Sequence, residues 1–129
     1  MKATSMKSFL VSLILLSAPS FTWAGDVRLL MFEEHGCYWC EKWDEEISVI
    51  YPKTLEGGVA PLERINIHTS IPEDISFNTQ PVYTPTFVIV KDSSEIGRIE
   101  GYPGADFFWG LLGNVLKDLP EFEEAKDAS

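Results

Sequence analysis

Two cysteines separated by two residues constrain this chain more than any other feature. Cys37 and Cys40, its only cysteines, lie where an apolar run of strand length (27–32) gives way to a helical pattern that includes Trp43 and Ile47. Cys37 is therefore expected at the start of a helix, where the helix dipole and unpaired N–H groups favour a thiolate over a thiol. The spacing also lets Cys40 close a small, reversible disulfide with Cys37. The pattern indicates thiol–disulfide exchange.

Two other uses of a cysteine pair compete with this interpretation. Closing a loop of about four residues stabilises a fold by about 2 kcal/mol, against about 5 kcal/mol for a loop of about 100 residues. A structural disulfide would therefore be expected between distant cysteines. A metal site would need more ligands, and His35 and His68, the only histidines, lack the paired spacing of a zinc site. We predict a redox-active Cys37–Cys40 disulfide, no metal and no other cofactor, and leave both alternatives open.

The N-terminal segment has the order of a secretory signal peptide. Two lysines precede an apolar run (9–16), and small residues stand at positions 22 and 24. The apolar run is about half the length that a membrane span needs, which disfavours an anchor. We predict that 1–24 is a signal peptide cleaved after Ala24. The mature chain, 25–129, would then be a single domain in the periplasm.

The chain is strongly acidic. Its formal net charge is −10, and loss of the two signal-peptide lysines makes it −12, because that segment contains no acidic residue. A body with this charge should be soluble and should repel nucleic acids and anionic membrane surfaces. We therefore expect no nucleic-acid partner, and we interpret the acidic stretch 121–127 as solvated surface.

The rest of the chain alternates strand and helix patterns. The helix after the cysteines is expected to end near Tyr51, and prolines make 68–83 a connection with at most a short helical turn. Gly97 marks a bulge or a close approach. Strands are predicted at 27–32, 61–67, 86–90 and 95–100, and a last helix at 105–119, ended by Pro120. This order, βαβ and then ββα, predicts an α/β fold: a minimal mixed sheet with helices on both faces.

Three motifs together resemble the thioredoxin superfamily over nearly the whole predicted mature chain. They are Cys37-Tyr38-Trp39-Cys40 after a strand, Thr84-Pro85-Thr86 at the start of a later strand, and the stretch 97–102 before the last helix. The resemblance implies a thioredoxin-like fold with Cys37 as the attacking thiolate and Cys40 as the resolving thiol. It also implies that Pro85 is a cis-proline facing them and that Thr84 offers backbone groups to a bound peptide.

The aromatic pair inside the motif has a predicted role of its own. Tyr38 and Trp39 would form an apolar rim suited to contact with a protein. The alternative is that Trp39 packs on its own neighbours. Tyr-Trp stands where typical thioredoxins have Gly-Pro, so their redox potential does not transfer to this chain.

A narrower resemblance covers 33–62, including Glu33, Gly36, Trp43 and the Ile50-Tyr51-Pro52 run. These residues are similar to the small periplasmic SoxS-type thioredoxins of bacterial sulfur-oxidation clusters. This resemblance implies a reductant that keeps the cysteine of a sulfur-carrier protein in its active state. Its electrons would come from a membrane thiol transporter, and its substrate would be a protein disulfide. Separately, we expect the protein to be a monomer.

The chain departs from typical thioredoxins at Met31, where they carry a buried acid that assists proton transfer. Glu33, Glu34 and Glu41 are candidates for that task, but we interpret them as solvated carboxylates, and His68 as a structural or surface residue. Acids flanking the motif disfavour a further negative charge and favour a reductant. The rival functions are a thiol oxidase or isomerase, a non-catalytic binding module and metal handling.

Overall fold

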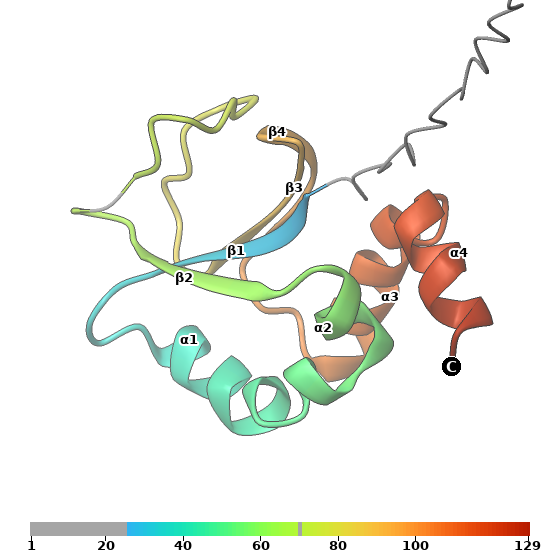
Figure 1. The fold of residues 1–129 in the computed structure, drawn as a ribbon. Helices are drawn as coiled ribbons and strands as arrows, with labels where there is room; N and C mark the ends of the chain where they lie inside the picture. The colour runs from blue at the N-terminus through green and yellow to red at the C-terminus, as the bar shows by residue number, and fades with distance from the viewer. Residues whose placement is uncertain (1–25, 70) are drawn as a thin grey trace, which may run out of the picture.

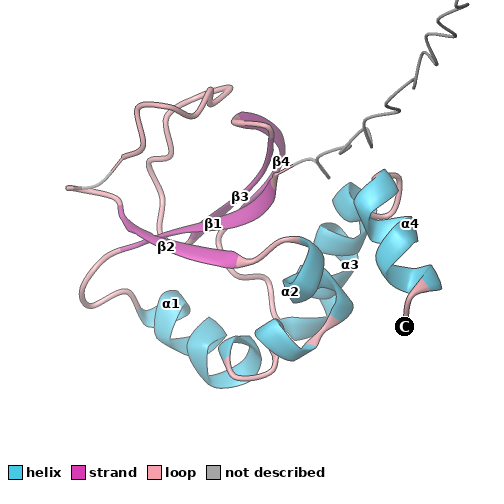
Figure 2. Cartoon of the chain, viewed as in Figure 1, coloured by secondary structure: helices cyan, strands magenta, loops and turns pink. Residues whose placement is uncertain are grey.

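A four-stranded mixed sheet forms the centre of the molecule, in a computed structural model that describes residues 26–69 and 71–129 (Figures 1 and 2). Its strands are β1 (Val27–Glu33), β2 (Leu62–Asn66), β3 (Thr86–Lys91) and β4 (Ser94–Glu100). They lie in the order β2-β1-β3-β4, with β1 parallel to β2 and antiparallel to β3, and β4 antiparallel to β3. The predicted signal peptide, 1–24, lies outside the described residues.

The helices follow the predicted order, with two additions, at 55–59 and at 120–127. They are α1 (Tyr38–Trp43), the π-helix η1 (Asp44–Ser48), the 3₁₀-helix η2 (Tyr51–Lys53), α2 (Leu55–Val59), α3 (Ala105–Leu116) and α4 (Pro120–Asp127). The α/β class and the arrangement βαβ then ββα are confirmed. The helical segment after the cysteines also ends close to Tyr51, as expected.

The two faces of the sheet are covered in different ways. One face packs against the helices, in a buried cluster where the rings of Trp43 and Phe108 lie 5.7 Å apart. The opposite face, which includes Phe32, packs against Ile75 and Phe77 of the connection between β2 and β3. Figure 1 shows helices on one side of the sheet and this connection on the other. The expectation of helices on both faces is therefore wrong.

The connection covers its face without a regular helix. Prolines at positions 72 and 81 remove backbone donors, and the described part of the segment forms turns at 67–69 and 73–74 and a bridge from Ser76 to Ser94. Arg98 of β4 anchors it, because its guanidinium donates to the Thr79 carbonyl at 2.6 Å and to the Glu95 carboxylate. A side chain from the sheet thus replaces the hydrogen bonds that a helix would have made internally.

Helix α3 lies on β4 at a glycine. A Cβ atom added to Gly97 would come within 2.6 Å of Val115, which is closer than side-chain atoms can approach. The predicted close approach at Gly97 is confirmed. It lets α3 pack directly on the edge strand.

Pro120 begins a separate helix, α4, after α3 has already ended. Helix α3 ends at Leu116, and Pro120 occupies the first turn of α4, where a missing N–H costs no hydrogen bond. Phe122 of α4 is buried against the helix-covered face. The acidic stretch 121–127 is therefore a docked helix: Glu121 is mostly buried and pairs with Lys91 of β3, while Glu123, Glu124 and Asp127 are exposed.

Candidate active site

The two cysteines form a disulfide where β1 leads into α1. Gly36, with φ at +77°, turns the chain after β1, and Cys37 is the N-cap residue of α1. The Sγ atoms of Cys37 and Cys40 are bonded. Cys37 is 9% exposed and Cys40 is 4% exposed, so both residues are largely buried and Cys37 is slightly the more accessible. The predicted position of Cys37 at the start of a helix is confirmed.

The start of α1 can support a thiolate on Cys37. The Cys40 backbone N–H donates a hydrogen bond to the Cys37 Sγ at 3.2 Å. The helical stretch continues without a break through η1 to Ser48, so the positive end of its dipole lies at the cysteines. A hydrogen bond to sulfur becomes stronger when the sulfur carries a charge, and the geometry therefore favours Cys37 as the ionised thiol after reduction.

Two aromatic side chains stand beside the disulfide. Tyr38 is 64% exposed and Trp39 is 53% exposed, and their rings meet edge to face with centroids 5.0 Å apart. Trp39 therefore packs on Tyr38 and also leaves half of its surface free. Both interpretations of Trp39 hold in part, and its role in substrate contact stays a prediction.

The β1–β3 pairing brings Thr84 and Pro85 towards the loop that carries the cysteines, where Thr84 bonds to Glu34. The Thr84–Pro85 peptide bond is cis, as the resemblance implies. β3 begins at Thr86, which lies opposite Phe32 of β1, and the chain before it therefore runs past the loop that carries the cysteines. The carbonyl of Pro85 accepts a hydrogen bond from the Gly101 N–H at 2.7 Å. The three motifs of the resemblance are thus brought to one end of the sheet.

A polar pocket of about 340 Å³ opens beside the disulfide. Both cysteines line it, together with acidic and basic side chains from the end of β1, from α1 and η1, and from β2. Arg64 is the cation among them: it donates to Glu33 at 2.7 Å and pairs with Asp44, which raises the pKa of its guanidinium. Sequence patterns did not single out Arg64, because its partners lie 31 and 20 residues away.

Glu34 also has a more specific place than a solvated carboxylate. One of its oxygens accepts a hydrogen bond from the Thr84 hydroxyl at 2.7 Å, and the other lies 2.6 Å from Nε2 of His68. The hydrogen bond from Thr84, and after it that from His68, lower the pKa of the Glu34 carboxyl. Glu34 is therefore a surface carboxylate, as interpreted, but one with two defined partners, and His68 is a surface residue that is one of them.

Met31 makes the floor of the site apolar. It is fully buried in the same cluster as Cys37 and Cys40. No acid stands at this position, so the carboxylates of the site lie in the polar pocket.

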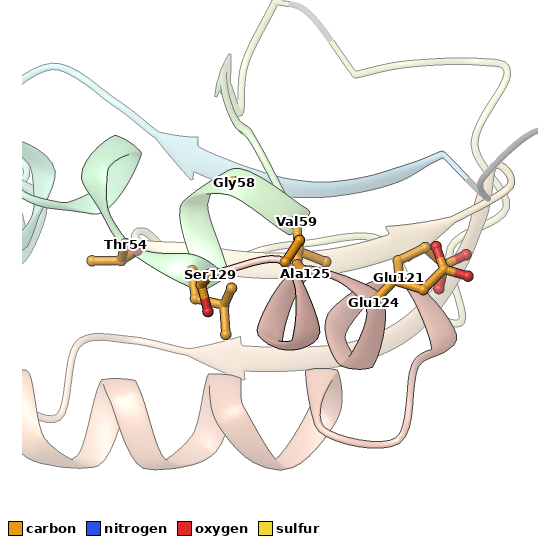
Figure 3. Close-up of a pocket in the computed structure, with 9 residues that line it drawn as sticks. Thr54, Gly58, Val59, Glu121, Glu124, Ala125 and Ser129 are labelled. Atoms are coloured by element: carbon orange, nitrogen blue, oxygen red, sulfur yellow. The ribbon is translucent and has the colours of Figure 1, made fainter.

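A second pocket lies elsewhere. It has a volume of about 620 Å³ and lies between α2 and α4, lined by residues such as Gly58, Val59 and Ala125 (Figure 3). None of the predicted site residues lines it. Within 26–69 and 71–129, no group of three or more His, Cys, Asp or Glu side chains could hold a metal ion, and no helix is long and apolar enough to cross a membrane.

Comparison with known proteins gives one significant structural match. The chain is similar to the crystal structure of the periplasmic thioredoxin SoxS from Paracoccus pantotrophus in its reduced form. The two are 44% identical, with a TM-score of 0.68, over 70% of this chain and 96% of that one. No protein-family model and no curated protein matches the chain.

Proposed function

The chain belongs to the thioredoxin family, as a relative of periplasmic SoxS, and on this premise we propose that it reduces disulfides of a protein partner in the periplasm. The coarser assignment, a thiol–disulfide oxidoreductase, follows from the family and from the Cys37–Cys40 disulfide. The observation that carries the proposal is this disulfide, with the more exposed Cys37 at the start of a helix and beside an acidic pocket.

The reaction is a two-step exchange that conserves atoms and electrons. In the reduced protein, the Cys37 thiolate attacks one sulfur of the partner disulfide, and the other partner sulfur leaves as a thiolate. Cys40 then loses its proton and attacks Cys37, which closes the intramolecular disulfide and releases the second partner thiol. Two electrons pass from the protein to the partner, and the disulfide seen in the structure is the product state.

The charges around the site support a reductant. A site that stabilises the thiolate also stabilises the reduced form and makes the protein oxidising. Here the Cys40 N–H supplies some stabilisation, but Glu33, Glu34, Glu41 and Asp44 line the pocket against a single arginine. Excess negative charge opposes a thiolate and favours the disulfide, so electrons leave the protein more readily.

The partner is proposed to be a sulfur-carrier protein whose active cysteine must stay reduced. The exposed rings of Tyr38 and Trp39 support a protein substrate, because aromatic side chains are enriched in protein interfaces. Each turnover leaves the disulfide oxidised, so a second thiol reaction must restore the dithiol. A membrane thiol transporter is the proposed electron donor, and the protein is proposed to act as a monomer after export.

The direction of electron flow can be tested by the reduction potential of the Cys37–Cys40 couple. Equilibration in redox buffers, followed by tryptophan fluorescence, should give a reduction potential of about −270 mV, as for a reducing thioredoxin. A value near about −120 mV would show an oxidant and overturn the proposed direction.

Catalysis itself can be tested with single cysteine variants. Cys37→Ser should abolish reduction of insulin disulfides while the protein stays folded. Cys40→Ser should instead accumulate a mixed disulfide between Cys37 and its partner, which a non-reducing gel would show as a band that thiols remove. Partner binding that is unaffected by Cys37→Ser, with no turnover by the wild type, would favour a binding module.

A further inference from the structure

The β1–β3 ladder stops just before it reaches the active site. Phe32 and Thr86 are the last paired residues at this end. Continuing the same antiparallel register by two residues places Glu34 opposite Thr84. The Thr84 Oγ1–H in fact donates to Glu34 Oε1 at 2.7 Å. A side-chain hydrogen bond thus continues the cross-strand contact after the backbone ladder has ended.

The same carboxylate contacts a third segment of the chain. Its second oxygen lies 2.6 Å from Nε2 of His68, two residues after the end of β2. The neighbouring backbone supports this arrangement, since the Ile67 N–H donates to the Glu33 carbonyl at 3.0 Å. Glu34 therefore joins the cysteine loop, the end of β2 and the segment before β3.

Other hydrogen bonds near Thr84 hold its neighbours to a different part of the molecule. The Thr86 hydroxyl donates to the Tyr83 carbonyl at 2.7 Å, and the Gly101 N–H donates to the Pro85 carbonyl. These contacts tie the segment to itself and to the chain after β4. The bond to Glu34 is the one that crosses to the cysteine loop, only three residues before Cys37.

We propose that Glu34 is a positioning residue for disulfide exchange. Its carboxylate holds Thr84, whose backbone the thioredoxin resemblance assigns to substrate docking, at a set place relative to the loop that carries Cys37. The inference rests on the proposed function, because docking at Thr84 matters only if the substrate is a protein. Small errors in the placement of reacting groups lower rates strongly, and hydrogen bonds to ionised groups are among the stronger ones.

The test compares variants that separate the hydrogen bond from the charge. Glu34→Ala removes both, whereas Glu34→Gln removes the charge and keeps an oxygen that can accept from Thr84. Thr84→Val removes the donor hydroxyl at similar volume. Glu63→Ala is the matched control, because Glu63 is a hydrogen-bonded carboxylate on β2 outside the pocket. Each is assayed with insulin and with the neutral small disulfide bis(2-hydroxyethyl) disulfide.

We expect Glu34→Ala and Thr84→Val each to lower kcat/KM for insulin by about tenfold, mainly through KM. The double variant should be no worse than either single variant, because both remove one shared bond. The ratio of kcat/KM for insulin to that for the small disulfide should fall in Glu34→Ala and Thr84→Val. It should stay close to the wild-type ratio in Glu34→Gln and Glu63→Ala, because loss of the Glu34 charge beside Cys37 acts on both disulfides alike.

Several results would overturn the inference while the wild type is active. One is a Glu34→Ala variant whose kcat/KM for insulin is unchanged, and another is a double variant whose loss of kcat/KM is the product of the two single losses. The others are equal losses of kcat/KM with insulin and with the small disulfide, or a loss in Glu34→Gln as large as that in Glu34→Ala. A wild type that reduces no protein disulfide would instead refute the proposed function. Positioning can be tested without activity, by the ¹⁵N order parameter of the Thr84 backbone amide. It should fall below about 0.6 in Glu34→Ala and stay at about 0.85 in Glu34→Gln. Unchanged order in both would refute positioning.

Discussion

At the scale of single residues, carboxylates near the site are held as ions by neighbouring hydroxyl groups. The pKa of Glu34 is lowered mainly by the Thr84 hydroxyl, and that of Glu46 mainly by the hydroxyl of Tyr102. A carboxylate whose pKa is lower in the folded protein contributes stability that is complete above its unfolded pKa. That contribution is lost as the pH falls through the folded pKa.

This linkage predicts a pH-dependent effect of Glu34→Gln. At about pH 7 the wild type should unfold at a higher urea concentration than the variant, because only the carboxylate carries the charge. The difference should shrink as the pH falls from the ordinary Glu value of 4.5 through the lower folded pKa. Urea unfolding of both proteins between about pH 7 and pH 3 measures it. Glu73→Gln, at an exposed turn, is the control. A difference in urea midpoint between wild type and Glu34→Gln that does not vary with pH would contradict the prediction.

At the scale of elements, the contact between α3 and β4 depends on the missing side chain at Gly97. Val115 occupies the space that a Cβ atom would need. On α3 itself, no heavy atom beyond the adjacent residues and the helix's own backbone lies within 4 Å of the Cβ position of Gly110. The two glycines therefore offer opposite environments for the same substitution.

We predict opposite signs for the two alanine variants. Gly97→Ala should lower the free energy of unfolding by about 1–3 kcal/mol, because α3 must shift away from β4. Gly110→Ala should raise it by about 0.5–1 kcal/mol, because alanine favours a helix interior over glycine. Chemical denaturation measures both. Partial recovery of Gly97→Ala by Val115→Ala would identify the clash as the cause, whereas a neutral Gly97→Ala would exclude it.

At the scale of the whole molecule, charge dominates the surface. The chain carries 20 Asp and Glu against 10 Lys and Arg, and four of the carboxylates line the pocket at the disulfide. A field of one sign raises the local concentration of cations and lowers that of anions, and salt screens it. Reactive groups of opposite charge should therefore meet Cys37 at different rates.

Two small disulfides of similar size test this field. The reduced protein should react faster with cystamine, a dication, than with 3,3′-dithiodipropionate, a dianion. The ratio of the two rates should fall towards the intrinsic ratio as the ionic strength rises from about 0.01 M to about 0.5 M. Stopped-flow tryptophan fluorescence gives both rates. A ratio independent of salt would show that the net charge does not act at the site.

Much of this molecule follows from local patterns along the chain. The Cys37–Cys40 pair, the strand before it and the helix after it are adjacent in sequence, so periodicity and spacing place them correctly. The close approach at Gly97 also followed, because glycine in a strand has few other uses. The prediction that Pro120 ends the last helix was wrong, since Pro120 lies in the first turn of α4. A proline that can end one helix equally suits the first turn of another.

The sequence by itself therefore determined the reactive disulfide, its position at the start of a helix, and the order of strands and helices. Only the tertiary structure decided that helices cover one face of the sheet and that Glu34 meets Thr84 beside the cysteines. The bond between them joins residues 50 positions apart, and Arg64 reaches Glu33 across 31. Such contacts depend on strand register, which is set by packing over the whole sheet and leaves no periodic trace in either segment.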